Sequence, residues 1–264
     1  MYKVTSYPHG AISWADCNST NWSTSKEFYI KVMGWQPEDI PIGDGHFYTM
    51  LKQDGETVGA VSAMQADMQA QGVPSHWSNY ISVDDVDALQ AKVTELGGTV
   101  IVPPMDVFDS GRMMMILDPT GAAINLWQAK NHIGAGLVNT VGAMMWNELM
   151  TTDPQKAMDF YGALLGWTFQ KMDEQDYYVI LNNGRMNGGI FPLAGEMANM
   201  PPAWMVYYNV ADLKASVEKV KSNGGSVHVE GNANGVGDFA LVADPAGSTF
   251  YIMEAKNVDT WDLN

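Results

Sequence analysis

Between Gly142 and Trp167 the chain reads GAMMWNELMTTDPQKAMDFYGALLGW, and this stretch decides the fold. In its first part, successive side chains are predicted to point to opposite faces of a strand, so that Trp146 and Glu148 share one face. A Thr-Asp-Pro sequence follows, which supplies an N-cap and a proline for the first helical turn. Apolar residues then recur at helical spacing until Gly166. The stretch therefore predicts a strand, a short turn and an amphipathic helix that ends at a glycine.

The same unit occurs 132 positions earlier, between Gly10 and Trp35. A later motif also repeats, because Asp118-Pro-Thr-Gly corresponds to Asp244-Pro-Ala-Gly at an offset of 126. The offset falls only from 132 to 126 along the chain, so the helices and strands of the two copies correspond while the loops between them differ in length. A period this long indicates duplication of a whole domain, since solenoid repeats run at ~20–50 residues. We therefore predict a first domain at residues 1–131, a linker at 132–141 and a second domain at 142–264.

The composition is that of an acidic globular protein, with 46% hydrophobic residues and a formal net charge of −16. Each copy is long enough to bury a core of its own. The charge argues against nucleic acid and anionic membranes as partners, and no apolar run reaches the ~18 residues of a membrane helix. A single cysteine, Cys17, excludes an intrachain disulfide and suits a reducing compartment. We expect a cytoplasmic monomer or homodimer whose partner is a small molecule.

In the first copy, residues 22–33 and 86–96 have helical periodicity, and short alternating segments follow each of them. This order, strand–helix–strands twice over, indicates the α+β class, with each half-copy a small sheet that its helix covers on one face. The uncovered faces of two such sheets then curve into an open cup. By strand alternation, the first cup is lined by Trp14, Asp16, Asn18, Ser78, Tyr80, Ser82, Asn125 and Trp127, and the second by Trp146, Glu148, Met150, Met205, Tyr207, Asn209, Tyr251 and Met253.

Five motifs in a fixed order resemble a known family. They are a Trp-x-Asp or Trp-x-Glu strand, a Phe-Tyr-x4-Gly-Trp helix end, Val-x-Asp-Val-Asp, Gly-Gly-x-Val and Asp-Pro-x-Gly. The pattern resembles the vicinal oxygen chelate superfamily, which holds glyoxalase I, bleomycin-resistance proteins and extradiol dioxygenases. It is most similar to the two-domain glyoxalase-family branch described as culture-filtrate antigens. The resemblance implies tandem domains, each built from two βαβββ modules that form an open cup-shaped sheet.

In metal-dependent members, the resemblance implies a His on strand one, a His on strand five and a Glu seven residues after the Asp of Asp-Pro-x-Gly. Indole, thioether and neutral amide groups do not replace imidazole and carboxylate as ligands of borderline divalent metals. We therefore expect no metal and no other cofactor, with a shifted ligand set that includes His76 and Asp16 as the alternative. The implied ligand positions hold Trp14, Ser78 and Asn125 in the first copy and Trp146, Met205 and Tyr251 in the second.

Two carboxylates, Asp16 and Glu148, lie at equivalent places in the middle of the first strand of each copy. A carboxylate on the inner face of a cup is partly desolvated, so it needs a partner or a raised pKa. One interpretation is a general base or an anchor for a cationic or hydroxylated ligand. The alternative is a structural carboxylate that is hydrogen-bonded to Tyr80, Tyr207 or Arg112.

Aromatic side chains are predicted to form the walls of both cups, which suits flat or apolar ligands. The alternative is that these rings simply fill the sheet interior. Arg112 is a candidate for holding an acidic ligand group, unless it pairs with a surface acid. Because the side chains predicted to line the second cup are bulkier than those of the first, we expect the first cup to be more open. The aromatic wall residues are Trp14, Trp127, Tyr80, Trp146, Tyr207 and Tyr251.

Three functions follow from these features, and whether the protein is an enzyme stays open. The first is a metal-free binding protein that holds a small aromatic or amphipathic molecule in one or both cups, as the resemblance to bleomycin-resistance proteins implies. The second is a metal-independent lyase, isomerase or hydrolase that uses Asp16 or Glu148 as base. The third, a metal-dependent glyoxalase or dioxygenase, is the least favoured because of the missing ligands.

Overall fold

The computed structural model describes residues 2–172 and 176–256, so residues 1, 173–175 and 257–264 lie outside the described part. The first copy contains strands β2 (Ile12–Ser19), β3 (Gln36–Gly43), β4 (His46–Gln53), β5 (Glu56–Ala63), β6 (His76–Ser82), β7 (Thr99–Val107), β8 (Gly111–Leu117) and β9 (Ala123–Ala129), with helices α1 (Trp22–Met33), α2 (Ala66–Ala70) and α3 (Val86–Glu95). The second copy contains β11 (Met144–Thr151), β12 (Thr168–Lys171), β13 (Tyr178–Asn182), β14 (Arg185–Pro192), β15 (Ala203–Asn209), β16 (Ser226–Ala233), β17 (Gly237–Ala243) and β18 (Thr249–Ala255), with helices α4 (Pro154–Leu165), η1 (Gly195–Met197) and α5 (Leu213–Ser222).

Each copy forms its own mixed sheet. The first sheet has the strand order β3-β4-β5-β2-β6-β9-β8-β7, and the second has the order β12-β13-β14-β11-β15-β18-β17-β16. In both sheets the first strands of the two modules pair antiparallel at the centre, as β2 with β6 and β11 with β15. A parallel pair flanks each centre on both sides. The α+β class and the two βαβββ modules per copy are therefore confirmed.

The deciding stretch folds as its sequence predicts. The side chain of Asp153 caps α4 by accepting from the backbone N–H of Lys156, and Pro154 occupies the first turn. Gly166 ends the helix in the left-handed region at φ 76°, which costs a glycine no strain. The earlier copy ends its helix at the same φ at Gly34. The two copies thus share their local capping chemistry.

The segment at 132–141, which the sequence predicts as the linker between the copies, packs against both of them. It contains β10 (Leu137–Val138), which pairs with β11 and with β1 (Tyr2–Lys3), and its residues 134–138 are buried. Two backbone bonds fasten it to the first copy, from Ala135 N–H to the Ser13 carbonyl at 2.8 Å and from Gly136 N–H to the Thr57 carbonyl at 2.8 Å. Sequence alone also missed β3 and α2, both of which are mostly exposed. Gly134 makes this close packing possible, because a Cβ there would lie 2.4 Å from the Ser13 carbonyl oxygen.

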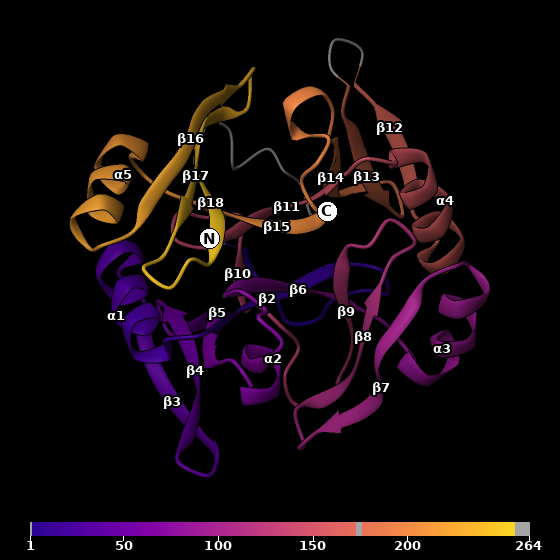
Figure 1. Ribbon diagram of the computed structural model, residues 1–264, viewed down its shortest axis with the longest axis horizontal. Helices are drawn as coiled ribbons and strands as arrows, with labels where there is room; N and C mark the ends of the chain where they lie inside the picture. Colours follow the sequence, from indigo (N-terminus) through magenta and orange to yellow (C-terminus); the bar gives the residue numbers. More distant parts are fainter. Residues whose placement is uncertain (1, 173–175, 257–264) are drawn as a thin grey trace.

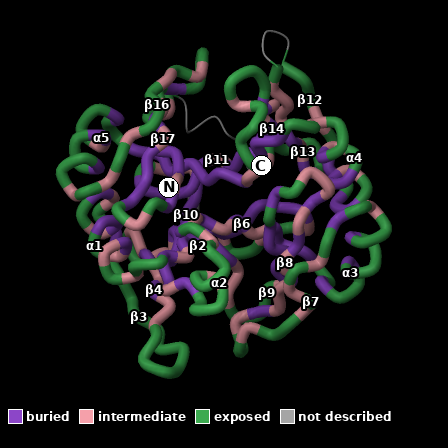
Figure 2. The backbone as a smooth tube through the Cα atoms, in the orientation of Figure 1, coloured by how far each residue is buried: buried purple, intermediate pink, exposed green. Residues whose placement is uncertain are grey.

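The two sheets pack back to back. Asn79 on β6 and Asn147 on β11 point away from their own cups and meet between the sheets, where the Asn147 Nδ2 donates to the Asn79 Oδ1 at 2.6 Å. Asn79 also donates to the carbonyl of Trp204 on β15 at 3.0 Å. Figure 2 shows buried residues along central strands such as β11 and exposed residues at hairpin ends such as β3. The cups of the two copies therefore face in opposite directions.

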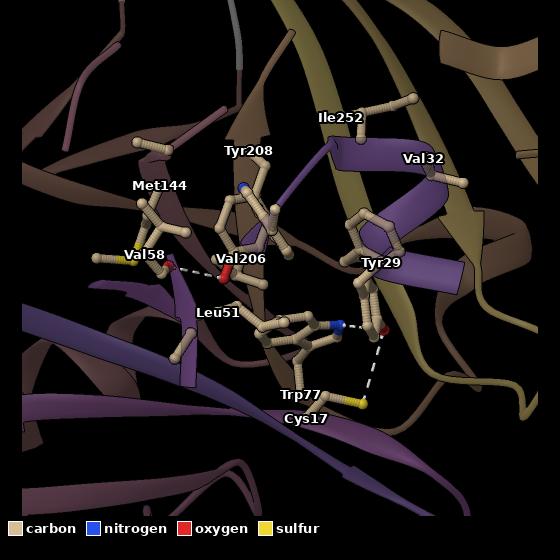
Figure 3. Packing of buried hydrophobic residues seen from close by; sticks show 14 of the residues in the cluster. Cys17, Tyr29, Val32, Leu51, Val58, Trp77, Met144, Val206, Tyr208 and Ile252 are labelled. Carbon is tan, nitrogen blue, oxygen red and sulfur yellow. Dashed lines mark hydrogen bonds between the residues drawn. The ribbon is translucent and has the colours of Figure 1, made fainter. Parts of the chain in front are cut away.

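Helices of one copy lie beside helices of the other. Figure 1 shows α1 next to α5 on one side of the molecule and α3 next to α4 on the other. The buried cluster in Figure 3 joins Tyr29 and Trp77 of the first copy to Val206, Tyr208 and Ile252 of the second. The copies thus share their cores, although each is long enough to build its own. None of the helices within the described ranges is long and apolar enough to cross a membrane.

Reciprocal hydrogen bonds join the repeated motifs across this interface. The phenol of Tyr29 donates to Asp244 at 3.2 Å, and the phenol of Tyr161 donates to Asp118 at 3.0 Å. Each phenol also accepts from an indole N–H, that of Trp77 in one case and of Trp204 in the other, both at 2.9 Å. The tyrosine of each Phe-Tyr motif therefore binds the aspartate of the other copy's Asp-Pro-x-Gly turn.

The Gly-Trp motifs make a second reciprocal pair. The indole N–H of Trp35 donates to the carbonyl of Gly142 at 2.7 Å, and that of Trp167 donates to the carbonyl of Gly10 at 2.8 Å. Gly10 and Gly142 have φ values of 80° and 79°, which favour glycine. The end of the first helix in each copy therefore fixes the start of the first strand in the other.

The twin tyrosines give a test of this interface. Tyr161→Phe removes the phenol donor from Asp118 Oδ2, whereas after Tyr29→Phe the Oδ2 of Asp244 still accepts from Ser25 Oγ at 2.6 Å. A buried polar group without a partner costs ~1–3 kcal/mol. We therefore expect Tyr161→Phe to lower the free energy of unfolding by about 1 kcal/mol more than Tyr29→Phe. Urea denaturation measures both values, and the reverse order would contradict this interpretation.

Candidate functional site

The inner face of the first sheet gathers most of the predicted site residues. Trp14 lies opposite Tyr80 and Asp16 opposite Ser78 in the β2–β6 pair. In the parallel β6–β9 pair, Tyr80 lies beside Asn125 and Ser82 beside Trp127. Residues at the intervening positions, among them Ala15, Cys17, Ile81, Ile124 and Leu126, belong to the shared cores. Strand alternation therefore sorts the side chains as the sequence predicts.

A network of hydrogen bonds holds the Asp16 carboxylate, which is 4% exposed. Its Oδ2 accepts from the phenols of Tyr48 and Tyr80, both at 2.9 Å. Its Oδ1 accepts from the amide of Asn18 at 3.1 Å, and that amide also reaches Ser78 Oγ at 3.2 Å. The Tyr48 phenol in turn accepts from the indole N–H of Trp14 at 3.0 Å. The carboxylate is therefore held by neutral donors alone among the described residues.

The electrostatics of Asp16 follow from this environment. Burial raises the pKa of the carboxyl group, and the phenol, amide and nearby His76 groups oppose the shift. The same carboxylate raises the pKa values of Tyr48 and Tyr80, although burial is the larger cause in each case. Both phenols consequently stay protonated and act as donors to Asp16. The network is thus well suited to receive a further donor from a ligand.

One wall of the first cup comes from the segment that follows β9. The His132 ring lies edge-on to Trp14 at 4.7 Å and to Trp127 at 6.0 Å between ring centroids. The indole N–H of Trp127 donates to the His132 carbonyl at 2.9 Å. Burial lowers the pKa of His132 to about 4, so the ring is neutral at physiological pH. Sequence analysis missed His132 because it placed residue 132 in a linker.

The second cup repeats the network around Glu148, which is 7% exposed. Glu148 accepts from the phenol of Tyr207 at 2.9 Å and is also hydrogen-bonded by Tyr177. The Tyr177 phenol accepts from the indole N–H of Trp146 at 2.8 Å. The ring of Tyr207 stacks on Tyr251 at 4.2 Å between centroids. Burial raises the pKa of Glu148 to about 7, and the two phenols oppose the shift.

Apolar side chains fill much of the second cup. Where the first cup has the partly exposed Asn18, Ser78 and Tyr80, the second has buried groups at the equivalent positions. One hydrophobic cluster is formed there by Met145, Met150, Leu193, Met205, Tyr207, Tyr251 and Met253. Trp146 of the second cup is also partly exposed, and Trp14 and Asp16 of the first are buried, so a more open first cup stays a prediction.

Both cups therefore contain the same chain of groups, in which an indole donates to a phenol and two phenols donate to a carboxylate. The sequence predicts the indoles, the carboxylates and one phenol of each chain. It misses Tyr48 and Tyr177, which come from the β4 strand and from the residue before β13. Their spacing of 129 falls between the offsets of 132 and 126 seen elsewhere, so the repeat itself was the signal.

Arg112 does not line the cup, contrary to the expectation. Its guanidinium forms two bonds to the Asp87 carboxylate on α3, at 2.7 and 2.8 Å, and lies 3.5 Å from Asp106. It shares the helix-facing side of β8 with the buried Met114 and Ile116. Arg112 therefore pairs with a surface acid, which is the alternative that the sequence left open. Arg112 fastens β8 to the first turn of α3.

The family's metal ligands have no equivalent at the implied positions. Trp14 and Trp146 use their indole N–H groups within the phenol chains, and Asn125 donates from its amide to the carbonyl of Asn79 at 3.3 Å. No group of three His, Cys, Asp or Glu side chains within residues 2–172 and 176–256 is arranged to hold an ion. His76, from the alternative ligand set, uses Nδ1 against the Pro74 carbonyl. The donor set does not fit the metal that the family implies.

The fold and the two cups define a tandem protein of the vicinal oxygen chelate type. Residues 12–126 and 138–252 each match the family described as the Glyoxalase/Bleomycin resistance protein/Dioxygenase superfamily. The chain therefore belongs to this superfamily, as the resemblance of its motifs predicts. The two matched ranges fall within the two sheets, apart from the short β10 strand that begins the second match.

Relatives resemble the chain over almost its full length. A Mycobacterium tuberculosis protein named "Putative glyoxylase CFP32" is 40% identical over 259 residues, which cover 96% of this chain and 98% of the relative. The "Anthracycline biosynthesis protein DnrV" of Streptomyces peucetius is 31% identical over 273 residues, which cover 96% of each chain. The conclusion on the family thus rests on two independent kinds of similarity.

Solved structures share the fold at low identity. The Mn(II)-bound glyoxalase from Novosphingobium aromaticivorans aligns with a TM-score of 0.64 at 17% identity, covering 96% of this chain and 86% of that one. A variant of homoprotocatechuate 2,3-dioxygenase from Brevibacterium fuscum aligns with a TM-score of 0.64 at 14% identity, covering 93% and 72%. These likenesses concern the backbone, and the chemistry of the cups has to be argued from their side chains.

The raised pKa of Glu148 predicts a pH dependence of stability. Its pKa is about 7 in the folded protein, above the 4.5 of an unperturbed Glu, so folding takes up a proton between these pH values. The free energy of unfolding should therefore fall as pH rises from 5 to 8, by up to ~3 kcal/mol from this group. Glu148→Gln does not titrate, so it should lose correspondingly less stability than the wild type. Urea denaturation of both proteins at pH 5 and pH 8 checks this, and parallel losses would refute it.

Proposed function

We propose that the protein binds a small, flat aromatic molecule in its first cup without the help of a metal ion. The ligand presents a hydroxyl or ammonium group to Asp16, and its ring lies among the aromatic wall residues. The observation that carries the proposal is the buried Asp16 carboxylate, which is held by phenol and amide donors on the inner face of the first sheet. Sequestration, rather than turnover, is the role that this arrangement supports best.

The unused hydrogen-bonding capacity of the first cup supports a ligand that donates. An ionised carboxylate has roughly four acceptor sites, and Asp16 uses three of them for Tyr48, Tyr80 and Asn18. The remaining site on Oδ1 suits a hydroxyl or ammonium proton. A protein of net charge −16 also attracts cations and repels anions at long range. A phenol or an aromatic amine meets these conditions better than a carboxylic acid does.

The comparison of the two cups supports the first as the binding site. Asn18, Ser78 and Tyr80 are partly exposed, while Met150, Met205 and Tyr207 at the equivalent positions are buried. The first cup thus offers partly exposed polar side chains to a ligand, whereas a ligand in the second has to displace apolar side chains. Displacing a packed cluster costs free energy that binding then has to offset. The second cup is better suited to a structural role.

The matched pair Asp16→Asn and Glu148→Gln tests the binding site. A thermal-shift screen with flat phenols and aromatic amines identifies a ligand, and an anthracycline belongs in it because one relative's name contains that word. We expect Asp16→Asn to weaken binding ~10-fold or more, since a hydrogen bond to a charged group contributes ~1.5–3 kcal/mol. Glu148→Gln should leave the affinity unchanged. Titration calorimetry measures both, and loss of binding in Glu148→Gln alone would transfer the site to the second cup.

Metal content is a separate test. We expect the purified protein, expressed without an affinity tag, to contain far less than one equivalent of Mn, Fe, Ni or Zn by elemental analysis. Treatment with a chelator should leave the ligand-induced thermal shift unchanged, because no side chain of the proposed site uses an ion. Stoichiometric metal, or a shift that disappears with the chelator, would show that the proposal is wrong in its metal-free part.

A second candidate function is a metal-independent lyase, isomerase or hydrolase with Glu148 or Asp16 as base. The pKa of Glu148 at about 7 favours it, because a general base works best when its pKa lies near the operating pH. The filled second cup weighs against it. Turnover of a bound ligand that survives both Asp16→Asn and Glu148→Gln would exclude these carboxylates as the base.

A further inference from the structure

Three methionines continue the inner face of the first sheet beyond Trp127. Met113 on β8 lies directly opposite Trp127 on β9, and Met105 on β7 lies opposite Met113. Met115 follows Met113 by two positions, so it shares the same face, as do the side chains of directly opposed residues. Met105 is 47% exposed, and Met113 and Met115 are partly exposed. Their thioethers therefore form an apolar surface on the cup side of β7 and β8, here called the methionine surface.

The equivalent place in the second copy is closed by packing. At the offset of 126, the three positions hold Gly231, Phe239 and Leu241. Phe239 and Leu241 pack against the apolar cluster of the second cup. The ring of Phe239 lies over Gly231, where a Cβ would be 2.6 Å from the ring. By contrast, the methionine surface belongs to none of the hydrophobic clusters that the described residues form.

The polar side chains of the first cup lie on other strands of the same sheet. Asp16 and Asn18 come from β2 and Ser78 from β6, and the last two are partly exposed. Figure 1 shows β9 between β6 and β8, as the strand order requires. Trp127 of β9 extends its ring across Gly111 of β8, where any Cβ would collide with the indole. An indole therefore connects the polar end of the inner face to the methionine surface.

The strand order sets the distance between these two ends. Neighbouring strands lie ~4.8 Å apart, and β2 and β8 are separated by three such spacings, or roughly 14 Å along the sheet. A single aromatic ring that donates to Asp16 is too short to reach β8. Methionine side chains adapt their shape and make favourable contacts with aromatic rings. The far end of the face is thus suited to the distal rings of a longer molecule.

We propose that the ligand of the first cup is an elongated, linearly fused aromatic compound with its hydrogen-bond donor at one end. The donor meets Asp16, and the distal rings lie on Met105, Met113 and Met115. The inference rests on the function proposed for the first cup, and it adds the length of the ligand and the residues that select for it. The carboxylate recognises the donor, and the methionine surface selects for reach.

Two isomeric phenols test the reach at constant composition. 2-Hydroxyanthracene has its hydroxyl at the end of three linearly fused rings. 9-Hydroxyphenanthrene has the same formula, but its hydroxyl is on the middle ring, so its rings extend less far from that group. We expect the wild type to bind the linear isomer about tenfold more tightly, because only its distal ring reaches the methionine surface. Fluorescence titration measures both affinities.

Substitutions of the methionines show whether they cause this preference. The double variant Met113→Ala, Met115→Ala should bind the two isomers with affinities within about twofold of each other, since the apolar contact is removed. Met113→Leu with Met115→Leu keeps the apolar volume and should retain the preference. Met200→Ala, which changes a methionine that is 44% exposed in the second copy, is the matched control and should behave like the wild type. Melting temperatures confirm that each variant is folded.

Methionine methyl groups report the position of the ligand directly. In protein labelled with ¹³C at these methyl groups, ring currents of bound 2-hydroxyanthracene should shift the signals of Met113 and Met115 but not that of Met200. Equal affinities of the two isomers for the wild type, or a preference that survives in the double alanine variant, would overturn the inference. The proposed function still holds in those cases if Asp16→Asn weakens binding of both isomers. If neither isomer binds, or if Asp16→Asn binds both like the wild type, the proposed function fails and the inference fails with it.

Discussion

The hydrogen bond from a tyrosine of one copy to an aspartate of the other is the interaction on which the rest of the structure depends. Tyr29 binds Asp244, and Tyr161 binds Asp118, deep between the sheets. Because each aspartate also orders its own turn, as Asp118 does through the backbone N–H groups of residues 120–122, the bond fixes a turn and an interface together. The sheets consequently pack back to back. Both inner faces are directed outward as a result.

A buried carboxylate in each cup is tolerable because neutral donors surround it. Desolvation disfavours the charged form, and two phenols restore part of what water supplied. The balance between desolvation of the carboxylate and its hydrogen bonds differs between the two cups. Asp16 has an amide as a third donor and lies among partly exposed polar groups, whereas Glu148 lies within methionine and tyrosine side chains. The same chain of groups therefore surrounds a carboxyl group with three neutral donors in the first cup and one with a pKa of about 7 in the second.

The repeat and the alternation of strand residues were sufficient to predict the fold and the inner faces of β2, β6 and β11. They were not sufficient for Tyr48, Tyr177 and His132, whose positions depend on contacts between segments distant in the sequence. The partner of Arg112 could not be chosen from the sequence for a related reason, since its bonds to Asp87 join β8 to α3. The Phe-Tyr and Gly-Trp motifs were recognisable as repeats, but their role as bonds between copies emerges only when both copies are seen together. Local periodicity predicts which face of a strand a side chain occupies. The contacts between the two copies can be recognised only in the folded protein, where both sheets are in place.

The relation to metal-dependent members can be understood at the level of single positions. Solved relatives with TM-scores near 0.64 share the backbone at 17% identity or less, so the fold survives almost complete replacement of its side chains. A metal in such a cup supplies an electrophile that attracts ligand oxygens. Here the equivalent inward positions carry Trp14, Ser78 and Asn125, and the neighbouring Asp16 supplies a hydrogen-bond acceptor instead. The function proposed for the first cup therefore requires a ligand that donates a hydrogen bond to Asp16, whereas the metal of metal-dependent members attracts ligand oxygens.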